Sequence, residues 1–115
     1  MLGLAGSITP TSSGNVAIWI AGDGTNNTLG DGCILRITMG TGTAPTNGQA
    51  LTGTDWSPAD LVVQANVATD VVPFPALGYA TGLTIGTPYW YDIAFAALTG
   101  GTCTLSKIGA TAFEQ

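Results

Sequence analysis

Few side chains in this sequence could serve as acids, bases or nucleophiles. The 115 residues include no histidine, and the only basic side chains are those of Arg36 and Lys107. Serine hydroxyls are present, but histidine, their usual general base, is missing. Lys107 directly follows Ser106, whereas a serine-lysine pair in an SxxK motif is three residues apart. We therefore expect a protein that is not an enzyme.

One pair of carboxylates has a spacing that suggests sugar chemistry. Asp55 and Asp60 lie on either side of Trp56, and a glycosidase needs two acids beside its sugar, often with an aromatic ring to stack on it. Capping of a loop by the two aspartates is the simpler interpretation, and we favour it. The same three residues are our candidate loop for contacting a glycan without cleaving it.

The segment from Asp23 to Asn27 offers oxygen atoms at alternate positions, as a calcium-binding loop does. The acidic residue expected at the twelfth position of such a loop is replaced by Ile34. A turn rich in asparagine and glycine explains the segment better. We therefore expect neither a metal site nor a cofactor.

The two cysteines, Cys33 and Cys103, are not spaced as metal ligands in a CxxC motif. A disulfide between them would close a long loop and stabilise the fold by roughly 4 kcal/mol. Two buried free thiols are the other possibility, and it is the one we favour.

Charge and hydropathy restrict the possible partners. The net charge of −5 and the isoelectric point near 4.1 argue against nucleic acid and against anionic membranes. Only 8% of residues are charged and the mean hydropathy is +0.37, but no apolar run is long enough for a spanning helix. Residues 1–6 lack the segments of a signal peptide, so we expect them to begin the mature chain. A surface so poor in charge favours an oligomer that covers part of it.

Apolar and polar residues alternate with period two through most of the chain, which predicts β-strands. In the segment 33–39 we expect Cys33, Leu35, Ile37 and Met39 to face inward, and Ile34, Arg36 and Thr38 to face outward. In the segment 61–67 the expected inward residues are Leu61, Val63, Ala65 and Val67. Further strands are expected at 16–21, 76–83, 89–97 and within 103–113, with turns or loops at 23–32, 46–58 and 84–87.

Pro73 and Pro75 are expected to interrupt strand pairing ahead of the strand at 76–83, because proline has no backbone N–H. Strands at these intervals predict a single domain over residues 1–115 with an antiparallel β-sandwich fold. We favour a jelly roll and keep an immunoglobulin-like or fibronectin-III-like sandwich as the alternative.

Aromatic residues gather on two of the expected strands. We interpret them as a hydrophobic core on one strand face and an oligomer interface on the other, rather than as a platform for sugars. The residues are Trp19, Tyr89, Trp90, Tyr91 and Phe95.

Three stretches resemble a small β-domain of tailed-bacteriophage structural proteins, found alone or at the C-terminal end of fibre-like chains. They are Gly6–Val16 (GSITPTSSGNV), Met39–Gly48 (MGTGTAPTNG), and Val72–Thr102, which includes GLTIGTPYW. The resemblance spans nearly the whole sequence. It implies a virion protein, a trimeric jelly roll similar to the tumour-necrosis-factor type heads that cap fibres or decorate capsids, without catalytic residues. A disulfide would be peculiar to this chain.

The segment Gly82–Tyr89 is also similar to the turn and tyrosine corner of fibronectin type III modules, in which a tyrosine hydroxyl contacts the upstream backbone. Two functions are thus expected. The first is a capsid-decoration or fibre-head module that acts as a homotrimer and docks on other virion proteins. The alternative is a module at a fibre tip that binds glycans of the bacterial surface.

Overall fold

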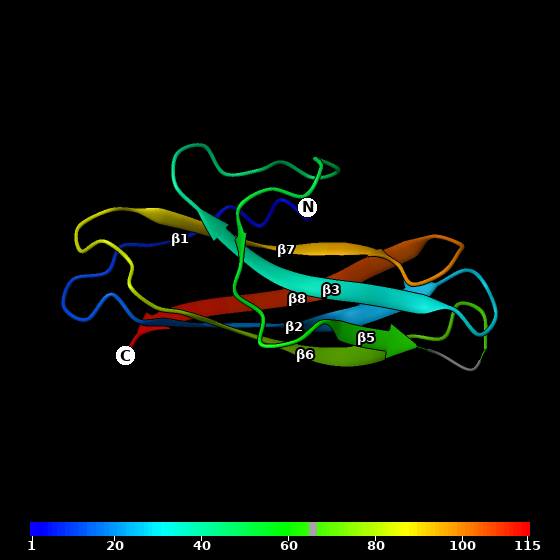
Figure 1. The fold of residues 1–115 in the computed structure, drawn as a ribbon. Coiled ribbons are helices and arrows are strands. Elements are labelled where there is room, and N and C mark those ends of the chain that lie inside the picture. Colours follow the sequence, from blue (N-terminus) through cyan, green and yellow to red (C-terminus); the bar gives the residue numbers. More distant parts are fainter. Residues whose placement is uncertain (65–66) are drawn as a thin grey trace.

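The computed structural model describes residues 1–64 and 67–115, and its regular elements are β-strands (Figure 1). These strands form two antiparallel sheets packed face to face, so the predicted antiparallel β-sandwich is confirmed. The strands are β1 (Gly6–Ile8), β2 (Val16–Asn26), β3 (Gly32–Gly40), β4 (Thr54–Asp55), β5 (Leu61–Gln64), β6 (Val72–Ala80), β7 (Tyr89–Ala97) and β8 (Cys103–Glu114).

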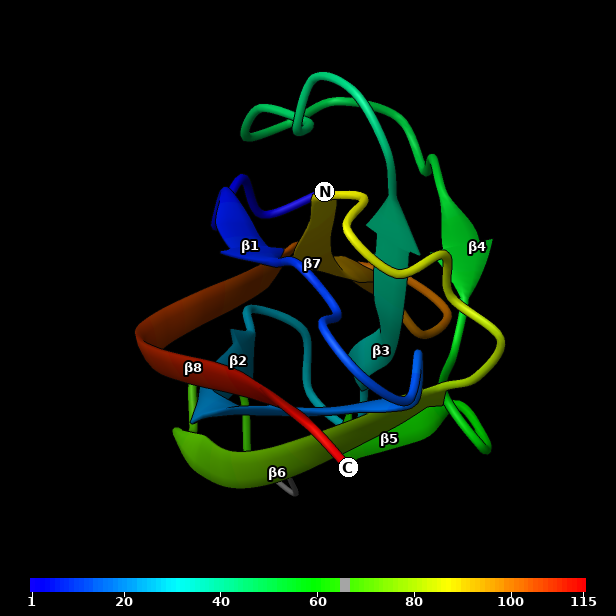
Figure 2. The ribbon, with the colours of Figure 1, turned by 90° about the vertical axis from the view of Figure 1, so that its left-hand side faces the viewer.

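The five-stranded sheet has the order β1-β7-β3-β4, and β5 also pairs with β3; the three-stranded sheet has the order β6-β2-β8. The end-on view in Figure 2 shows these sheets as two layers. The pairs β2–β6 and β3–β7 correspond to strands B–E and C–F of an immunoglobulin-type sandwich. The terminal strands are exchanged, since β8 lies beside β2 and β1 beside β7. The strand order therefore does not confirm the jelly roll.

The core between the sheets is built by the alternation that the sequence predicts. Branched and other apolar side chains on one face of β2 and β3 are 0–1% exposed, because each strand turns that face toward the opposite sheet. They are Val16, Ile18, Ile20, Cys33, Leu35, Ile37 and Met39.

The first half of β7 is buried on both faces. Trp90 and Ala94 are covered by Met1, and the carboxylate of Asp92 accepts hydrogen bonds from the N–H groups of Gly3 (2.8 Å) and Leu4 (3.1 Å). Thr38, which we expected to face solvent, is fully buried beside them. The expectation was wrong because the N-terminal residues fold across this part of the sheet, a contact that strand alternation does not reveal.

The prediction that Pro73 and Pro75 interrupt strand pairing was also wrong, since both lie in β6 and pair with β2. β6 is an edge strand. Tyr79 lies an even number of residues after both prolines, so its N–H points to the same side as theirs would. That N–H points away from β2 and donates to the carbonyl of Trp56 (3.1 Å). The prolines thus occupy positions whose N–H would point off the sheet, where no ladder hydrogen bond is lost.

Other boundaries differ by a few residues. β2 continues through Asp23 to Asn26, where a turn was expected. β5 ends at Gln64, Val67 is 57% exposed and not inward, and the expected strand positions Ala65 and Asn66 lie outside the described residues. The short strands β1 and β4 were not predicted, because three and two residues are too few to show a period.

Cys33 and Cys103 form a disulfide, so the favoured prediction of two free thiols was wrong. The bond connects β3 in one sheet to the first residue of β8 in the other, with Cα atoms 5.5 Å apart. The sequence separation of 70 residues says nothing about this proximity. It arises because both side chains point into the space between the sheets.

Candidate functional site

The outer face of the three-stranded sheet carries a group of large exposed apolar side chains. Trp19 of β2 is 58% exposed, Leu77 and Tyr79 of β6 are 50% and 45% exposed, and Phe113 of β8 is 41% exposed. We call these four residues the aromatic face. Strand alternation places them together, because the inward residues of the same strands fill the core.

The strand register explains how the aromatic face is arranged. Trp19 lies between Leu77 and Thr111, and the next row along the strands contains Tyr79, Ala17 and Phe113. The rings of Trp19 and Phe113 meet edge to face with centroids 6.3 Å apart. This is a favourable geometry for two aromatic rings, and it holds the indole of Trp19 in place on the surface.

Small residues beside Trp19 leave a hollow in the aromatic face. Its volume is about 340 Å³, and its lining is apolar: Trp19, Ile20, Ala21, Pro75, Ala76 and Leu77. At one end of this face, Lys107 contacts Asp23 at 3.6 Å, so these two charges form a pair. The surface thus combines a projecting ring with an uncharged hollow.

The predicted aromatic group divides between core and surface. Trp90 and Tyr91 are 7% and 8% exposed, and the indole N–H of Trp90 donates to the carbonyl of Thr41 (3.2 Å). Tyr89 and Phe95 are partly buried and pack on the main core. Of the five candidates, only Trp19 is largely exposed, so it is the one placed to contact a partner.

The tyrosine corner suggested by the sequence is present. The hydroxyl oxygen of Tyr89, at the start of β7, accepts a hydrogen bond from the N–H of Thr84 (3.0 Å). The bond ties the connection between β6 and β7 to the edge of the five-stranded sheet. This is the place that such a tyrosine has in immunoglobulin-type sandwiches.

The candidate glycan loop contains Asp55, Trp56 and Asp60, and the structure brings both aspartates to Arg36. Asp60 binds the guanidinium through both of its oxygens, one of them 3.0 Å from Nη2, and Asp55 lies 3.7 Å from Nε. The hydrogen bond from Arg36 holds the pKa of Asp60 below its usual value, and that of Arg36 is raised by the same contact. Two carboxylates held by one cation are not arranged as a separate acid and base.

Trp56 has mainly a structural position in this loop. Its N–H donates to the carbonyl of Ile37 on β3 (3.0 Å), and its own carbonyl accepts from Tyr79 on β6 (3.1 Å). The indole is partly buried and packs on the core. Asp55 caps the N–H of Ser57 (2.9 Å), as the loop-capping interpretation predicts. The loop therefore links the two sheets across one side of the sandwich.

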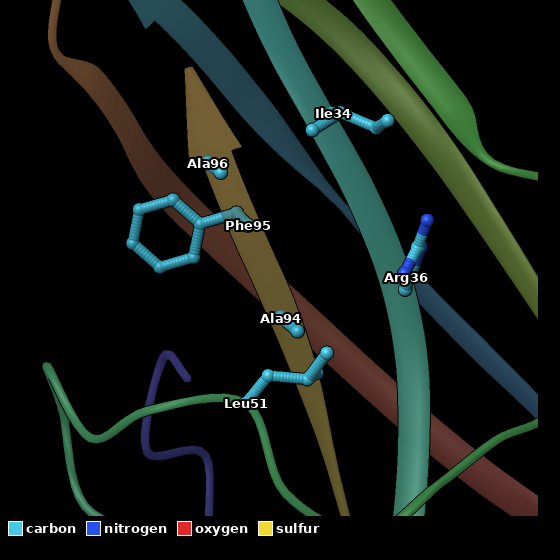
Figure 3. A pocket seen from close by; sticks show the side chains of 6 residues that line it. All are labelled: Ile34, Arg36, Leu51, Ala94, Phe95 and Ala96. Atoms are coloured by element: carbon cyan, nitrogen blue, oxygen red, sulfur yellow. The ribbon is translucent and has the colours of Figure 1, made fainter. Parts of the chain in front are cut away.

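A second hollow lies on the outer face of the five-stranded sheet (Figure 3). It has a volume of about 210 Å³, and Leu51, 58% exposed, comes from the loop between β3 and β4. The other lining residues belong to β3 and β7: Ile34, Arg36, Ala94, Phe95 and Ala96. With only Arg36 as a polar group, this hollow offers little to hold a polar ligand.

The segment considered for calcium has other roles. Asp23 faces Lys107, and the side-chain amide of Asn26 donates to the carbonyls of Gly32 (2.9 Å) and Gly100 (3.0 Å). In the described part of the chain, no three acidic or cysteine side chains gather as metal ligands. The asparagine instead fastens the turn between β2 and β3 to the one between β7 and β8.

Comparisons with known proteins give no family for this chain. No family model, curated protein or solved structure matches it. Within residues 1–64 and 67–115, no helix has the length and apolar character needed to cross a membrane.

Three residues of the aromatic face were missed by sequence reasoning: Leu77, Tyr79 and Phe113. A signal for two of them existed, because Leu77 and Tyr79 continue the alternation of β6, but Pro73 and Pro75 obscured the start of that strand. The position of Phe113 beside Trp19 depends on the register of β8 against β2, which the sequence does not contain.

Proposed function

We propose that this chain is a structural protein of a tailed-bacteriophage virion, a capsid-decoration or fibre-head module that acts as a homotrimer and docks on other virion proteins. The observation that carries the proposal is the aromatic face. The resemblance of the sequence to phage structural domains is the reason for proposing a virion protein. The aromatic face is the surface through which we propose that copies associate.

The size of the aromatic face supports an interface. An aromatic side chain can bury about 150–250 Å² of surface, so four large side chains at these exposures present an apolar surface on the order of 400 Å². That equals the largest apolar patch of many monomers, and a stable interface buries roughly 800 Å² on each partner. The aromatic face is therefore large enough to be the centre of an interface, with neighbouring polar residues as its rim.

Charge supports the same conclusion. Copies of a chain with net charge −5 repel one another, and they approach best through surfaces without carboxylates. Asp31 and Asp92 are buried, Asp55 and Asp60 lie beside Arg36, and Asp23 lies beside Lys107. This engagement of five of the seven carboxylates supports a role other than catalysis.

The test is the mass of the purified protein in solution, measured by light scattering after size exclusion at two concentrations. We expect about three times the chain mass of 11.5 kDa. Trp19→Ser should shift the protein toward monomer. Leu29→Ser is the matched control, because Leu29 is 69% exposed in a turn far from the aromatic face and its loss should leave the mass unchanged. A wild-type monomer, or a trimer unaffected by Trp19→Ser, would overturn the proposal.

Binding of a bacterial surface glycan at a fibre tip is the second candidate, and the exposed indole of Trp19 beside an open hollow favours it, since sugars stack on such rings. Glycan-array binding that disappears in Trp19→Ala and persists in Leu29→Ala would support this use. Equal signals from both variants, or no signal from the wild-type protein, would count against it.

A further inference from the structure

The loop between β1 and β2 surrounds a carboxylate with backbone donors. Four consecutive N–H groups, those of Thr11, Ser12, Ser13 and Gly14, point toward the side chain of Glu114 at the end of β8. Oε2 accepts from Thr11 N (2.8 Å) and Thr11 Oγ1 (3.0 Å). Oε1 accepts from Ser12 N (2.8 Å), Ser13 N (2.6 Å) and Gly14 N (3.1 Å), with Ser13 Oγ at 3.4 Å.

No basic side chain takes part in this contact. Arg36 is occupied by Asp60 and Asp55, and Lys107 lies beside Asp23. The negative charge of Glu114 is therefore stabilised by peptide dipoles and hydroxyl groups. Successive N–H groups that converge in this way form a nest, a concavity that binds anions in many proteins.

The loop is also held by contacts that do not involve Glu114. Its first and last residues are fixed by the turn between β6 and β7: Gly86 N–H donates to the carbonyl of Pro10 (2.8 Å), and Leu83 N–H donates to that of Gly14 (3.0 Å). The side chain of Pro10 is fully buried. Gly14 has a φ of +68°, and a Cβ there would lie 2.4 Å from the Leu83 carbonyl oxygen, so glycine is required.

We infer that residues 11–14 form a preorganised binding site for a carboxylate, which the chain fills with its own Glu114. The donors are divided between two oxygens, which matches a planar carboxylate. Thr11, Ser12 and Ser13 are exposed, so a small anion can reach the site from solvent when the glutamate side chain is removed. The end of β8 is thus attached to the loop between β1 and β2 in the way that an anion is bound by its site.

The test uses sodium acetate as the probe and the full chain with Glu114→Ala. Acetate should restore part of the lost stability, raising the melting temperature of the variant by about 4–6 °C when its concentration exceeds the dissociation constant about fivefold. The amide NMR signals of residues 11–14 should shift along the same saturation curve. Sodium chloride at equal ionic strength should do neither.

Two proteins serve as controls. In the wild type, Glu114 occupies the site, so acetate should have no more effect than chloride. Asp70→Ala removes one negative charge from a carboxylate that accepts no hydrogen bond among the described residues, and it should not respond either. A folded Glu114→Ala protein whose melting temperature and amide signals do not respond to acetate would overturn the inference.

A variant that does not fold still gives an answer. Glu114→Ser also empties the site, because its side chain is too short to reach the donors, and it should show the same acetate-dependent shifts in residues 11–14. If neither variant folds in chloride, recovery of folded protein in acetate supports the site, and failure to recover it overturns the site.

Discussion

Tyr89 shows how single polar groups hold the connections between the strands. Its hydroxyl is the acceptor for the N–H of Thr84, and the ring packs on the core between the sheets. The contact restrains the turn that also fixes both ends of the carboxylate-binding loop, through Leu83 and Gly86. One hydroxyl thus influences two neighbouring loops.

Tyr89→Phe should lower the free energy of unfolding by about 1 kcal/mol, because the ring remains and one hydrogen bond is lost. Urea unfolding measures the change. Tyr79→Phe is the matched control: Tyr79 is 45% exposed and its hydroxyl makes no hydrogen bond among the described residues, so the stability should change little. Equal effects of the two substitutions would show that the corner contributes nothing of its own.

Lys107 adopts a backbone conformation that suits glycine better. Its φ is +51°, and it lies at the irregularity where the register of β8 against β2 shifts between Ala21 and Asp23. A residue with a Cβ in this region is disfavoured by about 1–2 kcal/mol. The irregularity therefore stores strain at the centre of the last strand.

Lys107→Gly should raise the free energy of unfolding above that of Lys107→Ala by about 1 kcal/mol. Both variants lose the exposed contact with Asp23, so their difference reports the backbone conformation. Thermal unfolding of the two proteins side by side is sufficient. If the alanine variant proves as stable as the glycine variant, the positive φ is not a source of strain.

At the scale of elements, β8 is held at three places along its length. The disulfide anchors its first residue, pairing with β2 holds its middle, and Glu114 fastens its end to the loop between β1 and β2. The last of these contacts favours the ionised form of Glu114, because all of its partners are hydrogen-bond donors. The backbone N–H groups of Thr11 and Ser12 hold its pKa far below the usual 4.5.

This lowered pKa predicts how the contribution of Glu114 depends on pH. A carboxyl group that is more acidic in the folded protein stabilises the fold above its unfolded-state pKa, and the stabilisation is lost as the pH falls below about 4.5. The difference in unfolding free energy between the wild type and Glu114→Gln should therefore be constant near neutral pH and shrink toward pH 3.

Urea unfolding at a series of pH values measures this difference. Asp31 and Asp60 also have lowered pKa values, through hydrogen bonds from Thr99 and Arg36 respectively, so both proteins should lose stability in acid. Only the difference in unfolding free energy between the two proteins measures the contribution of Glu114. A gap that is unchanged between neutral pH and pH 3 would contradict the assignment.

The edges of the three-stranded sheet are treated differently. β6 is protected against pairing with another chain by Pro73 and Pro75 and by the bond from Tyr79 to the loop at Trp56. β8 is the opposite edge, and the irregularity at Lys107 interrupts it. Both edges of this sheet are thus poorly suited to pairing with another chain, which agrees with the proposed association through the aromatic face.

At the scale of the whole molecule, the two sheets are joined by packing and by one covalent bond. The disulfide between Cys33 and Cys103 closes a loop with a sequence separation of 70 residues. In the chain-entropy account, a loop of this length restricts the unfolded chain and stabilises the fold by about 4 kcal/mol.

Replacing both cysteines by alanine should lower the free energy of unfolding by about 4 kcal/mol. Urea unfolding of the double variant and of the wild type measures the change. Unfolding of the wild type with a thiol reductant is the control, because reduction keeps the volume of the buried side chains. A reduced protein within about 1 kcal/mol of the oxidised one would show that the crosslink adds little.

The sequence determined the fold class and most of the core. The alternation in β2 and β3 is local, so the inward positions of Ile18 and Leu35 followed from the chain itself. The tyrosine corner at Tyr89 was equally local, since donor and acceptor are five residues apart. Scarcity of charge and the absence of histidine also follow from the sequence and limit the chemistry.

Only the tertiary structure decided which strands are neighbours. The candidate sites depend on this choice, because neighbouring strands bring their residues together. Phe113 meets Trp19 because β8 pairs with β2, and Glu114 reaches a loop more than 100 residues earlier in the chain. Thr38 is buried because the N-terminal residues cross its sheet. The physical reason is the same in each case: strand periodicity specifies a face, whereas the partner of that face is chosen by packing between segments distant in sequence.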